Sequence, residues 1–259
     1  YRRHGAHYPQ KILFVAGLPK SGTTWLEQML AAYPGFHPLM HPAAVHYEQI
    51  TGGSHDYELP ADYFSRFGNM LVVNKMHVHG SLHNVHLLHQ ANVRYVILYR
   101  DLRDVAVSYY FYVRHTPWHP EYRQYINLSP EQGLRCFAER LLPAYMKWIQ
   151  SWHENRNPTQ SLMIRYEEMV QNPVKVMTDV AQLFEVYSTC DTIQSIVKSH
   201  HFARLSHGRQ PGEQQAASFF RKGIIGDWKT YFTPAVTDLY KQHIGSFLID
   251  YEYESDNAW

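Results

Sequence analysis

The sequence predicts an α/β fold: a single domain with a central parallel β-sheet flanked by helices and a P-loop-like turn. Short apolar runs at residues 12–16, 93–98 and 161–166 predict buried parallel strands, and residues 71–74 predict a weaker fourth. Each run precedes a helical pattern, and this alternation is typical of a parallel sheet with helices on both faces. We find no repeat or linker that divides residues 1–259, a length sufficient for one domain with a well-buried core.

The composition narrows the class of protein. Hydrophobic residues make up 45% of the chain and aromatic residues 15%, as expected of a globular protein, and the net charge of +1 gives no support to a nucleic-acid binder. The two cysteines, Cys136 and Cys190, cannot form a disulfide framework and suit a reducing compartment. No apolar run reaches the length of a membrane span, and the polar first ten residues are not expected to be a signal peptide. We therefore expect a cytoplasmic protein without nucleic-acid or membrane partners.

Two helices have clear signals in the sequence. The first is predicted over residues 23–32, directly after the first strand, and is ended by a Pro-Gly pair. The second begins after Ser129, with Pro130 at its first position and Gln132 completing a capping-box pattern. We expect Pro143 to kink this second helix.

The turn after the first strand reads G-L-P-K-S-G-T-T, residues 17–24. Its glycines are spaced as in a nucleotide-binding P-loop, but Lys20 precedes Gly22, whereas the P-loop lysine follows the second glycine. Backbone N–H groups of such a turn converge at a helix N-terminus, and Thr23, Thr24 and Lys20 add further donors. The turn therefore predicts a phosphate site, although glycine-rich turns also occur without a ligand.

A second group of anion-binding residues follows the strand at 93–98. Arg100 lies at its carboxyl end, where open α/β sheets bind ligands, and Ser108 lies two turns into the next helix. We interpret Arg103 and Asp104 as the solvated start of that helix. Two separate anion sites indicate a ligand with phosphates at both ends.

A third basic segment, R-K-G at residues 221–223, is a weak signal when taken alone. It lies in the stretch 205–233, which like 35–69 is rich in Gly, Pro, His and aromatic residues without clear periodicity. Segments of this kind in an α/β fold commonly hold ligands.

Four motifs together resemble the cytosolic, 3′-phosphoadenosine-5′-phosphosulfate (PAPS)-dependent sulfotransferase family. They are P-K-S-G-T-T-W (19–25), Y-R-D-L-R-D-V-A-V-S-Y-Y (99–110), R-Y-E-E-M-V-Q-N-P (165–173) and R-K-G-I-I-G-D-W-K-T-Y-F-T (221–233). The resemblance implies transfer of a sulfuryl group from PAPS to an alcohol, phenol or amine, with adenosine 3′,5′-bisphosphate (PAP) as product and no metal.

The same resemblance implies a role for each matching residue. The 5′-phosphosulfate would be bound by Lys20, Ser21, Gly22, Thr23 and Thr24, the adenine by Trp25, Tyr166 and Phe202, and the 3′-phosphate by Arg100, Ser108, Arg221, Lys222 and Gly223. One departure concerns Phe202, because the family's Thr-Ser-Phe pattern reads His-His-Phe at 200–202.

Residues 73–77, V-N-K-M-H, match the family's Lys-Thr-His at Lys75 and His77, whereas Met76 departs from it. A neutral imidazole suits removal of the acceptor's proton, so His77 is the expected base. Lys75 would hold the transferring oxygens beside Lys20. Since sulfuryl transfer resembles the loose, in-line transfer of phosphoryl groups, charge stabilisation should dominate.

Further histidines could also be interpreted as a metal site. His83, His86 and His89 could share a helical face, but no Asp, Glu or Cys nearby completes a ligand set. We expect a half-exposed polar helix face and no metal.

The acceptor pocket is predicted from the stretches 36–47, 77–80 and 109–118 and the segment before Arg221. Their aromatic content favours a small, partly apolar acceptor, as in natural-product or secondary metabolism. A phenol, an alcohol, an amine or carbamate, and a carrier-protein-bound hydroxyacyl chain remain open. The first residue is not methionine, which keeps open a domain of a larger synthase.

The motifs alone fix neither the assembly of the protein nor its reaction. The family's dimerisation segment K-x-x-x-T-V-x-x-x-E is matched at Lys229 and Thr233 but not at Pro234 and Asp238, so the oligomeric state stays open. A P-loop kinase and a non-catalytic nucleotide-binding module are the two rival functions.

Overall fold

The computed structural model describes residues 4–40, 42–51 and 55–259. Five strands form one parallel sheet in the order β2-β3-β1-β4-β5. Their bounds are β1 (Ile12–Gly17), β2 (His37–Leu39), β3 (Val72–Met76), β4 (Tyr95–Tyr99) and β5 (Ser161–Arg165). The predicted class and all four predicted strands are confirmed; the edge strand β2 was not predicted.

The register brings the carboxyl ends of the central strands to one edge of the sheet. β1 lies in the middle, with Ala16 opposite Met76 of β3 and Gly17 opposite Leu98 of β4. The residues that follow these strands therefore meet at this edge. They are the glycine turn after β1, His77 after β3 and Arg100 after β4.

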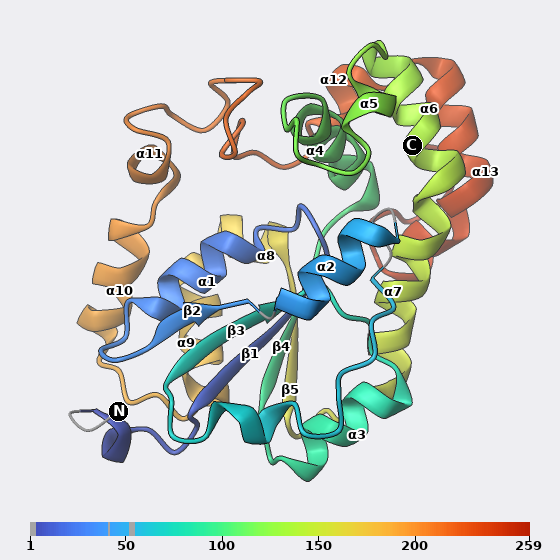
Figure 1. Ribbon diagram of the computed structural model, residues 1–259. Helices are drawn as coiled ribbons and strands as arrows, with labels where there is room; N and C mark the ends of the chain where they lie inside the picture. The colour runs from blue at the N-terminus through green and yellow to red at the C-terminus, as the bar shows by residue number, and fades with distance from the viewer. Residues whose placement is uncertain (1–3, 41, 52–54) are drawn as a thin grey trace.

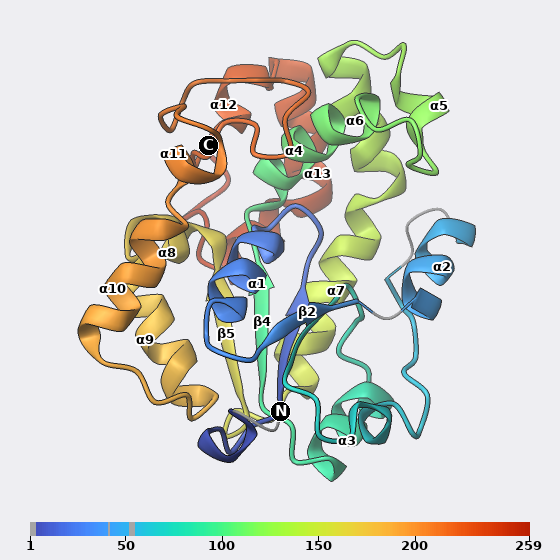
Figure 2. The same ribbon diagram turned by 60° about the vertical axis from the view of Figure 1, so that its left-hand side comes forward.

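Helices cover both faces of the sheet (Figures 1 and 2). On one face, Leu13 and Val15 pack with α1 (Thr23–Ala31), α8 (Tyr166–Gln171), α9 (Pro173–Leu183) and α10 (Cys190–Ser199). On the other, Phe14 and Ala16 belong to a core that includes α3 (Leu82–Gln90), α4 (Leu102–Arg114), α6 (Pro130–Arg140), α7 (Leu142–Asn155) and α13 (Pro234–Asp250). The alternation along β1 is what a strand with period two and two buried faces requires. The remaining helices are α2 (Pro42–Ile50), α5 (Tyr122–Tyr125), α11 (Phe202–Leu205) and α12 (Trp228–Tyr231), with 3₁₀ turns at Gly5–His7 and Phe64–Phe67.

The two predicted helix starts are confirmed, but the expected kink is a break. Ser129 Oγ accepts from Gln132 N at 3.3 Å, and Gln132 Oε1 accepts from Ser129 N at 2.9 Å, which forms the capping box of α6. The chain then leaves the helix at Leu141, and α7 begins with Pro143 in its first turn. Proline is tolerated there because those N–H groups have no helical partner.

The segment between α11 and α12 crosses from the side of α10 to the side of α13 (Figure 1). It has no regular element, yet its own hydrogen bonds organise it. Arg209 Nη1 donates to the carbonyls of Glu213 and Arg221 at 3.0 and 2.8 Å, and Gly212 N donates to Lys222 O at 2.9 Å. None of the helices within the described ranges combines the length and apolar composition of a membrane span.

Candidate active site

The glycine turn begins at the end of β1 and leads directly into α1. Gly22 is the N-cap of α1, with φ +82°, and no side chain caps the helix, so its first N–H groups can meet an anion. A Cβ at Gly22 would lie 2.7 Å from the ring of Tyr166. Glycine is thus required both for the left-handed backbone and for the close approach of Tyr166.

Lys20 lies within this turn and carries the strongest electrostatic perturbation among the lysines of the site. Its backbone has φ +67°, an uncommon conformation for a residue other than glycine. Burial lowers the pKa of Lys20 to about 7, and the positive charges of Arg100, Arg221 and Lys75 act in the same direction. Near neutral pH its charge therefore depends on what occupies the site.

Lys75 is fixed by partners that the sequence did not reveal. It lies on β3, and its Nζ is 3.1 Å from Glu27 Oε2 and donates to Thr24 Oγ1 at 3.2 Å. Both partners belong to α1, and both Lys75 and Glu27 are buried. The lysine therefore connects β3 with the helix that follows the glycine turn.

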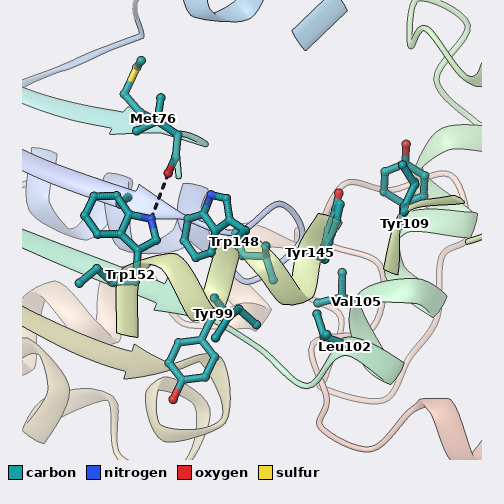
Figure 3. Close-up of a cluster of buried hydrophobic side chains, with 14 of the residues drawn as sticks. Met76, Tyr99, Leu102, Val105, Tyr109, Tyr145, Trp148 and Trp152 are labelled. Atoms are coloured by element: carbon teal, nitrogen blue, oxygen red, sulfur yellow. Dashed lines mark hydrogen bonds between the residues drawn. The ribbon is translucent and has the colours of Figure 1, made fainter. Parts of the chain in front are cut away.

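His77 follows β3 and points its Nδ1 at the carbonyl oxygen of Gly17, 2.5 Å away. A carbonyl can only accept, so Nδ1 carries the ring proton and the neutral ring keeps its lone pair on Nε2. Two indoles of α7 hold the backbone here: Trp148 Nε1 donates to His77 O and Trp152 Nε1 to Val78 O, each at 3.1 Å. Figure 3 shows both tryptophans in the buried cluster beneath β3.

Arg100 is tied to Asp104, and the interpretation of Asp104 as a solvated residue is wrong. Arg100 Nη2 donates to Asp104 Oδ2 at 3.0 Å and to Ile224 O at 2.9 Å. Asp104 is 1% exposed and also accepts from the backbone N of Gly226 and Trp228, at 2.8 and 2.9 Å. This one carboxylate joins the start of α4 to the segment after the R-K-G turn.

The interpretation of Arg103 as a solvated residue is wrong as well. It is 2% exposed and donates to the carboxylates of Asp101 and Glu254. Its guanidinium lies 4.1 Å from the ring centroid of Trp228, within cation–π distance. The helix start is buried because α12 and the last residues of the chain pack over it.

The R-K-G turn lies against Asp227, which is 2% exposed. Arg221 Nη2 and Lys222 Nζ both pair with its carboxylate, the latter at 2.6 Å. Gly223 has φ +66°, and a Cβ there would collide with the ring of Phe202. Glycine therefore lets the turn and Phe202 pack together.

One cavity of about 660 Å³ brings these groups together. Every predicted site residue except Ser21 lines it: Lys20, Gly22, Thr23, Thr24, Trp25, Lys75, His77, Arg100, Ser108, Tyr166, Phe202, Arg221, Lys222 and Gly223. Ser21 is fully buried behind the turn.

The rest of the lining comes from the predicted acceptor stretches and from residues the sequence did not reveal. Within the described part of those stretches, which excludes residue 41, the cavity takes Met40, Val45, His77, Tyr109, Tyr112, Trp118, Phe219 and Phe220, whereas Phe36 packs in the core against Tyr8. Lining residues outside the predicted acceptor stretches include Gln49, His55, His119, Pro120 and Tyr145. Gln49 and His55 lie in the stretch 35–69, whose composition is typical of ligand-binding segments, and His119 and Pro120 directly follow a predicted stretch, whereas Tyr145 had no signal.

The histidines of α3 lie away from the cavity. His83, His86 and His89 are exposed, which confirms the predicted polar helix face. His83 Nε2 bonds to Leu59 O at 2.8 Å, and His89 Nδ1 to Gln160 Oε1 at 3.0 Å. Within residues 4–40, 42–51 and 55–259 no three His, Cys, Asp or Glu side chains group as metal ligands.

Known proteins resemble this chain in sequence. Residues 10–252 match the model of the Sulfotransferase domain. Sulfotransferase 1B1 of Canis lupus familiaris is 27% identical over 183 residues, which cover 63% of this chain and 58% of the relative. Sulfotransferase 1A1 of Rattus norvegicus is 24% identical over 266 residues, or 93% of this chain and 86% of the relative. Over the matched regions, the chain spans only 54% to 58% of the length of the dog 1B1 relative and of three further sulfotransferases.

Solved structures share the fold. Mouse sulfotransferase SULT7A1 complexed with PAP matches with a TM-score of 0.65 and 19% identity, over 93% of this chain and 87% of that chain. Retinol dehydratase in complex with androsterone and the inactive cofactor PAP matches with a TM-score of 0.66 and 18% identity, over 96% and 85%.

Proposed function

The chain belongs to the sulfotransferase domain family, and on that basis we propose that it transfers a sulfuryl group from PAPS to a hydroxyl or amine of a small-molecule acceptor, releasing PAP. The observation that carries the proposal is that two basic regions and His77 share one cavity. The partly aromatic lining suits an acceptor of natural-product or secondary metabolism.

The residues present fit a donor with an anion at each end. The glycine turn, Lys20 and Lys75 would hold the 5′-phosphosulfate. Arg100 and the R-K-G turn, with Ser108, would hold the 3′-phosphate. Arg100 Nε and Arg221 Nη1 are buried without a hydrogen-bond partner in the described part of the chain, and a phosphate oxygen would satisfy both.

The aromatic residues between these two regions suit the adenine. Trp25 and Tyr166 have ring centroids 6.4 Å apart, with planes at 70°. Phe202 lies on Gly223 and lines the same cavity. We therefore propose that Trp25, Tyr166 and Phe202 bind the adenine ring.

The chemistry follows from the tautomer of His77. The acceptor's oxygen or nitrogen forms a bond to sulfur while its proton moves to His77 Nε2. The bond between sulfur and the oxygen that joins it to the 5′-phosphate breaks, and PAP leaves with the electron pair. Lys20 stabilises the charge on that oxygen, and Lys75 that on the transferring group.

Labelled PAPS tests the proposal against a panel of phenols, alcohols, amines and a carrier-bound hydroxyacyl thioester. Label in any acceptor supports the proposal, and the acceptor that is labelled identifies the substrate class. Tight PAP binding without turnover of any acceptor favours the non-catalytic module. Magnesium-dependent transfer of phosphate from ATP to an acceptor would instead support the rival function, a P-loop kinase.

A further inference from the structure

Lys20 makes a contact that the family motifs do not explain. Its Nζ lies 3.7 Å from the ring centroid of Tyr112, on α4, and 4.8 Å from that of Phe219, in the segment before the R-K-G turn. Both distances are within cation–π range, which extends to about 6 Å. Both rings also line the acceptor part of the cavity.

The other cations of the cavity are held differently. Each faces a buried carboxylate: Lys75 pairs with Glu27, Arg100 with Asp104, and Arg221 and Lys222 with Asp227. For Lys20, by contrast, no carboxylate lies within ion-pair distance in the described part of the chain. The charged groups that act on it are cations from three elements, Arg100 after β4, Lys75 on β3 and Arg221 before α12. In the described part of the chain, the ring faces of Tyr112 and Phe219 offset this repulsion.

We propose that Tyr112 and Phe219 are positioning residues that hold the Lys20 ammonium on their ring faces until the anionic end of the donor draws it away. This inference rests on the proposed function, since the donor supplies the anion. The ring quadrupoles attract the ammonium, and no carboxylate among the described residues competes for it. Lys20 can therefore move from the ring faces to a phosphate oxygen without first breaking an ion pair. An acceptor that packs on the same rings would also favour the exchange, because it covers the faces that the ammonium leaves.

The test measures the titration of Lys20 without nucleotide. Acetylation of Lys20 by acetic anhydride, followed by mass spectrometry across pH, reports its deprotonated fraction. We expect Tyr112→Leu and Phe219→Leu each to increase the acid dissociation constant of Lys20 about two- to five-fold, because the charged form loses a ring face. Tyr112→Phe keeps the ring face and should keep the wild-type midpoint, whereas rings with a purely structural role would leave the Lys20 midpoint unchanged in all three variants.

A second measurement repeats the titration with PAP. We expect PAP to raise the midpoint and to abolish the difference between wild type and the leucine variants, since Lys20 then faces phosphate. Phe219 is 53% exposed, so Phe219→Leu keeps the test decisive if Tyr112→Leu fails to fold. A midpoint that stays or rises in the leucine variants, or a difference that persists with PAP bound, overturns the inference. Failure of PAP to bind wild type counts instead against the proposed function, and the nucleotide-free comparison still decides the ring contact.

Discussion

Asp104→Asn is the sharpest test of how Arg100 and the segment after the R-K-G turn are joined in the proposed 3′-phosphate region. Asp104 Oδ2 accepts from Arg100 and Gly226, and Oδ1 accepts from Trp228, so both oxygens are used. Asparagine keeps one of these acceptors and turns an amide N–H₂ toward a donor at the other. It also leaves the Arg100 charge buried without its anion.

The size of the effect follows from burial. Breaking a buried ion pair by removing one partner costs about 3–5 kcal/mol. Because Asn retains one acceptor, we expect the lower end, about 3 kcal/mol of the free energy of unfolding. For a chain of this length each kcal/mol lowers the melting temperature by roughly 2–4 °C, so we expect a fall of about 6–12 °C. The affinity for PAP should fall at least about tenfold, since the pair orients Arg100 with a charge-assisted bond.

The chain offers a matched control in Asp62. It also pairs with an arginine four residues away, Arg66, at 2.7 Å, but the two side chains are 62% and 49% exposed. Exposed pairs of this kind contribute little, so Asp62→Asn should leave the melting temperature nearly unchanged. Circular dichroism during heating and calorimetric titration with PAP measure both variants. If Asp104→Asn melts and binds PAP like Asp62→Asn, the carboxylate does not join Arg100 to the segment after the R-K-G turn.

Three further predictions concern catalysis and pH. His77→Ala should lower turnover at least about a hundredfold and leave PAP affinity nearly intact, because the proposed base acts on the acceptor. His89→Ala, on the exposed face of α3, is the control. Unchanged turnover in His77→Ala would show that His77 is not the base. The affinity for PAP, measured by calorimetry across pH, should rise as the phosphates of PAP lose their second protons at about pH 6, and should fall as the Lys20 ammonium loses its proton above about pH 7. In Lys20→Met the fall on the alkaline side should disappear. If that fall persists in Lys20→Met, another group is responsible for it. Burial raises the pKa of Glu167 to about 7, although Arg100 acts in the opposite direction, so the folded state keeps a proton that the unfolded chain releases at lower pH. The free energy of unfolding should therefore fall between about pH 4.5 and 7, by at most about 3 kcal/mol. Denaturant titrations should show no such fall in Glu167→Gln, and equal pH profiles would contradict the assignment.

The sheet and two of the predicted anion sites, the glycine turn and Arg100, could be derived from local sequence because their signals are local, whereas most other site residues were implied by the family resemblance. Apolar runs identify buried strands, and in a parallel sheet the residues after neighbouring strands meet at one edge. Arg100 was placed at this edge by this rule, whereas His77 was assigned from the resemblance to the family motif. The edge strand β2 escaped prediction because it has only three residues, two of them exposed.

The misinterpreted helix start shows where local reasoning ends. Arg103 and Asp104 look like the charged first turn of a surface helix, and nothing within ten residues contradicts this. What buries them is contact with Gly226, Trp228 and Glu254, more than 120 residues away in the chain. No periodicity encodes such a pairing.

Other residues that line the cavity were not singled out for a similar reason. His55 follows α2, and Tyr145 lies in the first turn of α7, where its spacing is that of an ordinary core residue. Their ring centroids lie 5.6 Å apart, and that of His55 lies 5.7 Å from His77. Only the fold brings the three rings together.

The two ways of holding cations in this cavity have different consequences for binding. Asp104, Asp227 and Glu27 pair with these cations within the fold, and the pairs with Asp104 and Asp227 orient Arg100 and Arg221. Such pairs leave part of each guanidinium for the ligand: the unsatisfied Arg100 Nε and Arg221 Nη1 can bind phosphate without breaking an ion pair. In the proposed reaction Lys20 stabilises the charge on the reacting oxygen, and a carboxylate beside it would compete for the ammonium and repel the donor. Aromatic faces hold the ammonium without adding negative charge where the sulfuryl group must pass.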